Sequence, residues 1–284
     1  VCEGATTTLA NSTIGGVWSS LTTAVATIDA GGIVSGVASG NSIIRYRVTN
    51  GFGCIADATA TVTVNALPSV AAITGTLSVC QGLTTTLSSV TAGGVWTSSN
   101  TGVATVGLLT GLVAGINGGT ATITYSTGCG TAPVQTVSVT PFPGFISGST
   151  TICETATTTY LNSVGGGTWS SSNPAVATIG SLDGLVTGIS GGLTTITYST
   201  GCGTAALRTL SVTPATGTTS GASVVCQGAT TTLTNTSTGG LWISSNPAVA
   251  TIGSLSGVVT GVSAGVSNIT YGTGCGTGAI VAMS

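Results

Sequence analysis

The sequence predicts an all-β protein, built as a tandem array of four β-sandwiches in an elongated rod. Three observations predict this fold: an internal period of about 73 residues, short strand-like segments between turn residues, and a composition rich in Thr, Val, Ile and Gly. β-Branched residues favour strands, and short strands at even spacing with turn signals are typical of sandwiches. No segment has the opposed charged and apolar faces of an amphipathic helix.

Cysteine and tryptophan residues mark the period. The string "SSNPAVATIGSL" occurs twice, and the first cysteine of each unit is followed sixteen residues later by a tryptophan. These first cysteines are Cys2, Cys80, Cys153 and Cys226, the tryptophans are Trp18, Trp96, Trp169 and Trp242, and the second cysteines are Cys54, Cys129, Cys202 and Cys275. The pattern predicts four repeats at residues 1–66, 67–140, 141–213 and 214–284, of which repeat 1 lacks its first strand and repeat 4 ends near its last.

Repeat 3 illustrates the predicted strands in order. "GFISGSTTIC" and "TATTTYLNSV" are the first two, and "GGG" then makes a tight turn into "TWSSS", because glycine adopts the positive φ that such turns need. The Asn-Pro pair "NP" is expected to form a turn before "AVATIG", because proline fixes φ. "GLVTGIS" and "LTTITYS" follow, and "TGCGT" turns into "LRTLSVT". Seven strands are therefore expected in each complete repeat.

The pattern W-[ST]-S-[ST]-N-x-x-[VA]-A-T-[IV], followed by G-[LV]-V-[TA]-G and T-I-T-Y, resembles the bacterial immunoglobulin-like (group 2) repeat. That family occurs in intimin- and invasin-type adhesins and in giant surface proteins. The cysteine pair and "GG-x-W" are similar to versions in long secreted proteins of Bacteroidota-type bacteria. The resemblance covers the whole chain four times. It implies immunoglobulin-like sandwiches, an extracellular or cell-surface location, and a projecting or binding role without catalytic residues.

The eight cysteines predict disulfides and an oxidising compartment. Zinc sites need clustered spacings such as C-x₂-C, which do not occur here. Two pairings stay open. One is a bond within each repeat, and the other joins neighbouring repeats, as Cys2 with Cys129, Cys80 with Cys202, and Cys153 with Cys275. The second pairing follows if the two cysteines of an immunoglobulin-like sandwich lie at its opposite ends, and it reserves Cys54 and Cys226 for further units.

The aromatic residues of the motif have a structural interpretation. The four tryptophans are expected to fill the cores, although stacking against carbohydrate is the alternative. The tyrosines that precede the second cysteines, Tyr46, Tyr125, Tyr198 and Tyr271, are expected to cap the cores with their hydroxyls outside.

Two polar features are candidate contact sites. Arg45 and Arg47 alternate around Tyr46 and so share a strand face, which makes them either a contact patch or a solvated face. Three sequons, at Asn11, Asn235 and Asn268, are possible glycosylation sites.

Composition argues against several function classes. The chain has no His or Lys, three Arg and five scattered acidic residues, so it lacks the close pairs that general acid–base catalysis uses, and we expect no enzyme activity and no metal or other cofactor. Nucleic-acid binding would need many more cationic residues. No apolar run is long enough for a membrane span. The low net charge of −2 leaves self-association plausible.

The ends of the repeat pattern suggest how copies associate. Two explanations for the missing first strand of repeat 1 stay open: the chain is an excerpt of a longer array, or another chain donates the strand. We therefore expect a structural stalk or filament on the bacterial surface, with self-association end to end or by strand donation. The alternative is an adhesin whose repeats bind a host or cell-surface glycan, or a protein, directly.

Overall fold

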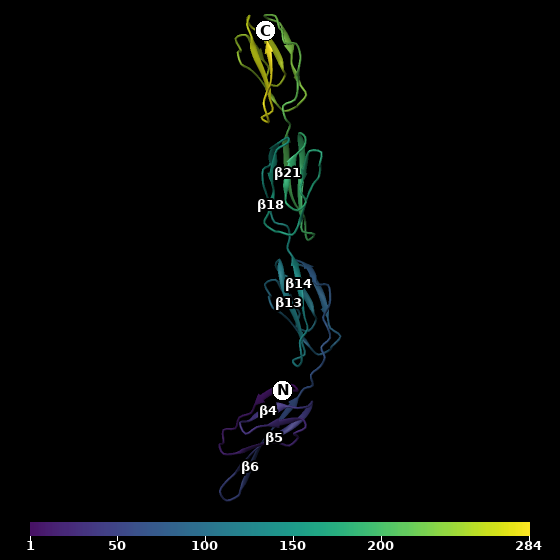
Figure 1. Cartoon of the computed structure of the whole chain (residues 1–284), viewed down its shortest axis with the longest axis vertical. Coiled ribbons are helices and arrows are strands. Elements are labelled where there is room, and N and C mark those ends of the chain that lie inside the picture. The colour runs from purple at the N-terminus through teal and green to yellow at the C-terminus, as the bar shows by residue number, and fades with distance from the viewer. The chain divides into compact units, whose positions relative to one another are not determined.

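The computed structural model describes residues 1–284, and every regular element in it is a β-strand (Figure 1). This confirms the predicted all-β class. By its internal contacts the chain divides into two compact units, Val1–Thr140 and Pro141–Ser284. Each unit contains two separate hydrophobic cores, one in each sequence repeat. The four repeat boundaries themselves stay predictions.

Repeat 2 has the most complete sandwich. Its strands are β7 (Thr74–Gly75), β8 (Ser78–Cys80), β9 (Thr84–Ser88), β10 (Val95–Ser98), β11 (Ala104–Val106), β12 (Leu112–Gly115), β13 (Gly119–Ser126) and β14 (Val134–Thr140). They form two four-stranded sheets in the orders β10-β13-β14-β8 and β11-β12-β9-β7. Every pair is antiparallel except β8 with β14, which is parallel.

The segment predicted as one first strand is therefore two strands in different sheets. β7 pairs with β9, and β8 pairs with β14. The break falls at Gly75, where φ is +130° and a Cβ would overlap the Thr86 carbonyl oxygen. Glycine is the residue that tolerates both demands.

Repeats 3 and 4 follow the same plan. Repeat 3 contains β15 (Ile146–Ser147), β16 (Thr151–Cys153), β17 (Thr157–Thr159), β18 (Leu161–Asn162), β19 (Thr168–Ser171), β20 (Ala177–Ile179), β21 (Leu185–Gly188), β22 (Gly192–Ser199) and β23 (Ala206–Thr213). Repeat 4 contains β24 (Thr219–Ser220), β25 (Thr230–Thr232), β26 (Thr234–Asn235), β27 (Leu241–Ser244), β28 (Ala250–Ile252), β29 (Val258–Gly261), β30 (Ser267–Gly272) and β31 (Ala279–Met283). The seven strands expected in repeat 3 are nine, because its first two are each interrupted.

Repeat 1 has a shorter list of strands. They are β1 (Thr6–Thr8), β2 (Val17–Ser20), β3 (Ala26–Ile28), β4 (Ile33–Gly36), β5 (Gly40–Thr49) and β6 (Ile55–Val64). The sheet orders are β1-β4-β3 and β2-β5-β6. No counterpart of β7 is present among residues 1–66, so β1 is an edge strand.

Alternation of side chains builds each core. In β13, Ala121, Ile123 and Tyr125 are buried, while the residues between them are half-buried or exposed. Their buried side chains pack with those from the facing sheet, among them Leu87 and Val113. This period-two burial is what a strand with one inward face produces.

The turns follow the predicted chemistry. In "SSNPAVATIGSL" of repeat 3, the Asn173 side chain accepts from the Ala175 N–H, and the Asn173 carbonyl accepts from the Val176 N–H. In repeat 2, Gly111 has φ +67°, and a Cβ there would overlap the Leu87 carbonyl oxygen beside the Trp96 ring. The repeated glycines at this position are therefore required by close approach as well as by the backbone angle.

Candidate functional site

The five acidic residues are dispersed, and each has a local partner. Asp57 binds Arg47, and the other four accept backbone N–H groups: Glu3 from Ser39, Asp29 from Gly31 and Ile33, Glu154 from Ala215, and Asp183 from Leu185. No three His, Cys, Asp or Glu side chains gather in a way that could hold a metal ion. The structure also holds no helix of the length and hydrophobicity that a bilayer crossing requires.

The disulfides join one repeat to the next. Cys2 of repeat 1 is bonded to Cys129 of repeat 2, with 5.7 Å between their Cα atoms and a sequence separation of 127. Cys153 is bonded to Cys275 in the same way, with 5.5 Å and a separation of 122. The pairing within repeats, which the sequence left open, is therefore not the one these four cysteines adopt.

Topology explains the pairing. β16 ends at Cys153 and runs parallel to the last strand of its repeat, β23, so this cysteine lies where the chain leaves repeat 3. Cys2 likewise bridges in parallel to Asn65, just after β6. The second cysteine of the following repeat lies in the hairpin between its last two strands, as Cys129 does between β13 and β14.

Two cysteines differ from the expectation that all eight form disulfides. Cys54 and Cys226 are free and exposed. Cys80 and Cys202 are not free thiols, and the predicted bond between them stays a prediction. The free cysteines are the second cysteine of repeat 1 and the first of repeat 4, which the pairing between repeats leaves without a partner in residues 1–284.

Each tryptophan packs against the tyrosine directly opposite on the neighbouring strand. The ring centroids lie 4.5–4.7 Å apart in all four repeats. Trp96, Trp169 and Trp242 are 5–7% exposed, whereas Trp18 is half-buried. The arrangement contributes cross-strand aromatic packing at the same register in each sandwich.

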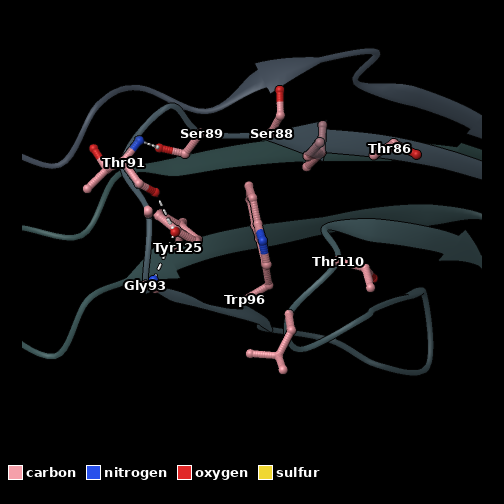
Figure 2. A pocket seen from close by; sticks show the side chains of 12 residues that line it. Thr86, Ser88, Ser89, Thr91, Gly93, Trp96, Thr110 and Tyr125 are labelled. Atoms are coloured by element: carbon pink, nitrogen blue, oxygen red, sulfur yellow. Dashed lines mark hydrogen bonds between the residues drawn. The ribbon is translucent and has the colours of Figure 1, made fainter.

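The tyrosine hydroxyls are not outside, contrary to expectation. The Tyr125 hydroxyl donates to the Thr91 carbonyl and accepts from the Gly94 N–H, at 2.6 and 2.9 Å. Figure 2 shows this hydroxyl turned toward the Thr91 loop. Tyr46, Tyr198 and Tyr271 bond their own loops in the same manner. The ring fills the core while the hydroxyl ties down the glycine-rich turn before the tryptophan strand.

A shallow groove recurs beside this pair in repeats 2 and 4. In repeat 2 its volume is about 450 Å³, and Ser and Thr side chains line it around Trp96 (Figure 2). Leu109 also lines this groove. The groove of repeat 4 is about 400 Å³ and has Leu255 and Trp242 in the same places. Both leucines are more than 75% exposed. Because the tryptophans are buried, the groove offers hydroxyls and one exposed leucine rather than an aromatic platform.

The predicted arginine patch is partly neutralised. Arg47 forms a bidentate ion pair with Asp57, at 2.7 and 2.6 Å. This hydrogen bonding raises the pKa of Arg47 and lowers that of the Asp57 carboxyl. The Arg45 Nε donates to the Ser19 hydroxyl at 3.3 Å. Of these two arginines, Arg45 is therefore the one whose guanidinium has no carboxylate partner.

The three sequon asparagines are in different situations. Asn268 is exposed and lies on β30, and its backbone N–H donates to the Ser245 hydroxyl. Asn11 is exposed and its side-chain oxygen accepts from the Thr13 N–H. The Asn235 amide donates to the Gly217 carbonyl and the Thr219 hydroxyl. A glycan on Asn235 would have to break these bonds, so the other two are better placed for modification.

Sequence reasoning missed Arg208, which faces the first strand of repeat 3. Its guanidinium donates to the carbonyls of Ile146 and Gly148 and lies over the Tyr160 ring, 6.0 Å from the centroid. Tyr160 is 1% exposed and replaces the leucine of the other repeats. Burial raises the pKa of the Tyr160 hydroxyl. The paired departure from the repeat pattern, a tyrosine and an arginine in the same unit, was the available signal.

Comparison with known proteins gives a family and one curated relative. Residues 133–209 match the family described as bacterial Ig-like domain (group 2). Ice-binding protein 1 of Shewanella frigidimarina (strain NCIMB 400) is 30% identical over 305 residues, which cover 90% of this chain and 32% of that protein. The chain therefore spans about a third of the relative's length.

Similar solved structures are repeat proteins at low TM-score. Invasin, a bacterial integrin-binding protein, matches with a TM-score of 0.35 and 15% identity over 94% of this chain and 71% of its own. Domains 4–9 of the surface layer protein SbsC match with a TM-score of 0.22 and 16% identity, over 95% and 57%.

The recurring Trp–Tyr pair and glycine turns lie within the matched segment as well as outside it. Residues 133–209 are thus similar to the bacterial Ig-like domain of group 2.

Proposed function

We propose that this chain is a structural, non-catalytic segment of an extracellular bacterial protein, in which disulfide-stapled immunoglobulin-like repeats form a stalk or filament. The observation that carries the proposal is the bonding of Cys2 to Cys129 and of Cys153 to Cys275, each between successive repeats. Disulfides persist in oxidising environments, which supports a location outside the cytoplasm.

The positions of the bonds suit a protein that bears tension. A pull applied to the two chain ends passes from Cys2 through sulfur to Cys129, so the residues between them carry none of it. Fully extended, those 127 residues would span roughly 420–460 Å, at about 3.3–3.6 Å each. The second bond protects a similar length. A stalk built this way keeps its length even when a sandwich opens.

Single-molecule pulling tests this role. The chain is held by its ends as the Cys54→Ser/Cys226→Ser variant, which removes the two free thiols and leaves the bonded cysteines. In the oxidised molecule, the residues enclosed by each disulfide should not contribute to the extension of the pulled chain. After reduction, we expect the extension to increase by about 400 Å or more for each of these two bonds. Equal extension before and after reduction would refute the tension-bearing role.

End-to-end association by the free thiols is the finer part of the proposal. Cys54 occupies the place of Cys129, and Cys226 occupies the place of Cys153, so one copy offers each half of the bond that joins neighbouring repeats. With oxidised glutathione as oxidant, two thiols would become one disulfide and release two molecules of reduced glutathione. We expect iodoacetamide to label two cysteines before reduction, and electron micrographs of the oxidised chain to show filaments. Dispersed monomers, unchanged by the oxidant, would contradict association by this route.

Direct binding of a surface is the second candidate function. The groove repeated in repeats 2 and 4 supports it, as does the 30% identity to a protein named for binding ice. Against it, the exposed threonine strands are short, such as Thr157–Thr159, and are interrupted between repeats. Thermal hysteresis and glycan-array measurements on the purified chain would distinguish the two roles. Activity lost on Leu109→Ser/Leu255→Ser substitution would favour the groove as a binding surface.

A further inference from the structure

All three phenylalanines of the chain lie at its surface. Phe52 is 96% exposed, Phe142 is 47% exposed and Phe145 is 94% exposed, whereas the tryptophans of repeats 2 to 4 are buried. A single exposed apolar side chain needs no explanation, but one that lines a hollow is a candidate contact for a ligand. Phe145 is in that position.

A slot of about 360 Å³ lies beside Phe145 in repeat 3. Residues 143–146, which lead into β15, form one wall, and residues 204–207, which lead into β23, form the other. Phe145 belongs to the first wall, and Leu207, which is 66% exposed, belongs to the second. Thr204 is also exposed, so its hydroxyl is accessible from the slot. The slot therefore offers an aromatic ring, an aliphatic side chain and a hydroxyl.

Contacts on either side of the slot fix its two walls to each other. Phe142 packs so closely on Gly203 that a Cβ at this glycine would overlap the phenylalanine ring. Beyond Leu207, the Arg208 guanidinium donates to the Ile146 carbonyl at 3.0 Å. The slot is therefore formed before a ligand enters, which lowers the entropic cost of binding.

The backbone on both sides of Phe145 is held as well. The Gly144 N–H donates to the Asn162 side-chain oxygen at 3.0 Å, and the Asn162 amide donates back to the Gly144 carbonyl at 2.7 Å. Ile146, on the other side, is 8% exposed and is part of the core of repeat 3. Phe145 is thus presented from a fixed backbone, and only its side-chain torsions remain to be ordered on binding.

No charged side chain lines the slot. Arg208 follows Leu207 in the chain, but its guanidinium bonds the carbonyls of Ile146 and Gly148 and lies over the Tyr160 ring. An anionic ligand would therefore find no free counter-charge. A membrane surface would find none of the Lys and Arg residues that accompany apolar residues in interfacial segments. The slot fits a neutral ligand that has both an apolar face and polar groups.

We propose that this slot of repeat 3 binds a neutral hexose unit of an oligosaccharide, with one sugar ring stacked on Phe145. The face of an aromatic ring carries negative partial charge, and one face of a pyranose consists of C–H groups with a small positive partial charge. Leu207 packs against the other side of the sugar, and the Thr204 hydroxyl bonds the hydroxyls at its rim. This site deepens the second candidate function, direct binding of a surface, on which it rests.

The size of the slot agrees with such a ligand. Small-molecule sites measure roughly 300–1,000 Å³, and about 360 Å³ is at the lower end of this range. The slot therefore holds a sugar residue or a disaccharide rather than a long chain.

The ring is particular to repeat 3. Ala72 occupies the place of Phe145 in repeat 2, and Thr218 occupies it in repeat 4. Neither side chain offers a face on which a sugar can stack. We therefore expect one such site in the chain, and the alanine of repeat 2 supplies a natural replacement for its test.

The test is saturation-transfer difference NMR of the full oxidised chain with cellobiose, maltose and lactose as neutral probes. We expect at least one of these disaccharides to bind saturably, with one site per chain. The C–H protons of one ring face should receive the strongest transfer, because they lie on Phe145. Sialyllactose should bind no more tightly than lactose, since its carboxylate meets no cation in the slot.

Matched protein variants locate the site. Phe145→Ala should weaken binding by about tenfold or more, because it removes the stacking face. Phe145→Trp should bind at least as tightly as the unchanged chain, since it restores a larger ring. Phe52→Ala removes an equally exposed phenylalanine from repeat 1 and should leave binding unchanged, as should Leu109→Ser/Leu255→Ser.

Three results would overturn the inference. They are equal binding by Phe145→Ala and the unchanged chain, no binding of any of the three disaccharides, and binding of phosphatidylcholine vesicles in place of sugars. Loss of binding in Leu109→Ser/Leu255→Ser alone would assign it to the grooves of repeats 2 and 4 instead. The pulling experiment reads the disulfides and not this slot, so the stalk role and the sugar site can fail independently.

Discussion

The Tyr125 hydroxyl gives the sharpest stability prediction, because one oxygen serves two backbone groups. Tyr125→Phe keeps the ring against Trp96 and removes only this oxygen, leaving the Gly94 N–H and the Thr91 carbonyl without their partner. Gly94 is buried, so its N–H loses a bond that water replaces poorly, whereas Thr91 borders the open groove and its carbonyl can be hydrated.

The magnitude follows from that difference. An unsatisfied buried group costs about 1–3 kcal/mol, and a rehydrated one costs little. We therefore expect the free energy of local unfolding of repeat 2 to fall by about 2 kcal/mol. Amide hydrogens that exchange through this local unfolding should then exchange roughly 30-fold faster.

Hydrogen–deuterium exchange measured by mass spectrometry is the assay, because proteolytic peptides report the exchange of each repeat separately. Amides of β10 and β13 should exchange faster in Tyr125→Phe, while those of repeat 4 should not change. Tyr271→Phe should reverse this pattern, since its hydroxyl bonds Ser237 and Gly240 in the same way. Less than threefold acceleration in the affected repeat would show that the hydroxyl does not hold the turn.

Three further predictions concern local geometry and charge. Gly111→Ala should lower the free energy of unfolding of repeat 2 by more than about 1 kcal/mol, because the new Cβ would overlap the Leu87 carbonyl oxygen at a position where φ is already positive. Gly93 also has a positive φ but open space around it, so Gly93→Ala should cost about 1 kcal/mol. Urea denaturation of the two variants checks this order. Thr155 has φ +66° where the other repeats have glycine, so Thr155→Gly should raise the melting temperature, and a fall would contradict the strain. The Asp57 pKa is lowered by its bond to Arg47, so the pair's stabilisation is present above the ordinary Asp pKa of about 3.9 and is lost as pH falls through the lower folded value; a carboxyl NMR titration should show that depression disappear in Arg47→Ala.

The all-β class, the repeat and the core role of the tryptophans could be predicted because each depends on local periodicity. Segments rich in Thr, Val and Ile between glycine turns are compatible with few structures other than strands. A tryptophan recurs at the same position of each unit, opposite a tyrosine of the neighbouring strand. The tyrosine hydroxyls were predicted wrongly, because sequence spacing does not say that the loop of Thr91 folds back over the end of β13.

The functional features needed the tertiary structure. Sequence spacing allowed Cys2 to pair within its repeat or beyond it, and the parallel pairing that places it beside Asn65 decided the matter. The neutralisation of Arg47 by Asp57 depends on the register between β5 and β6.

By itself, then, the sequence determined the all-β class and the period of the repeat, because backbone propensity and side-chain alternation are read within a few residues. Only the tertiary structure decided which sulfur meets which, and that Phe145, Thr204 and Leu207 line one slot. Those relations join residues far apart in the chain, and they depend on strand pairing that no local pattern encodes.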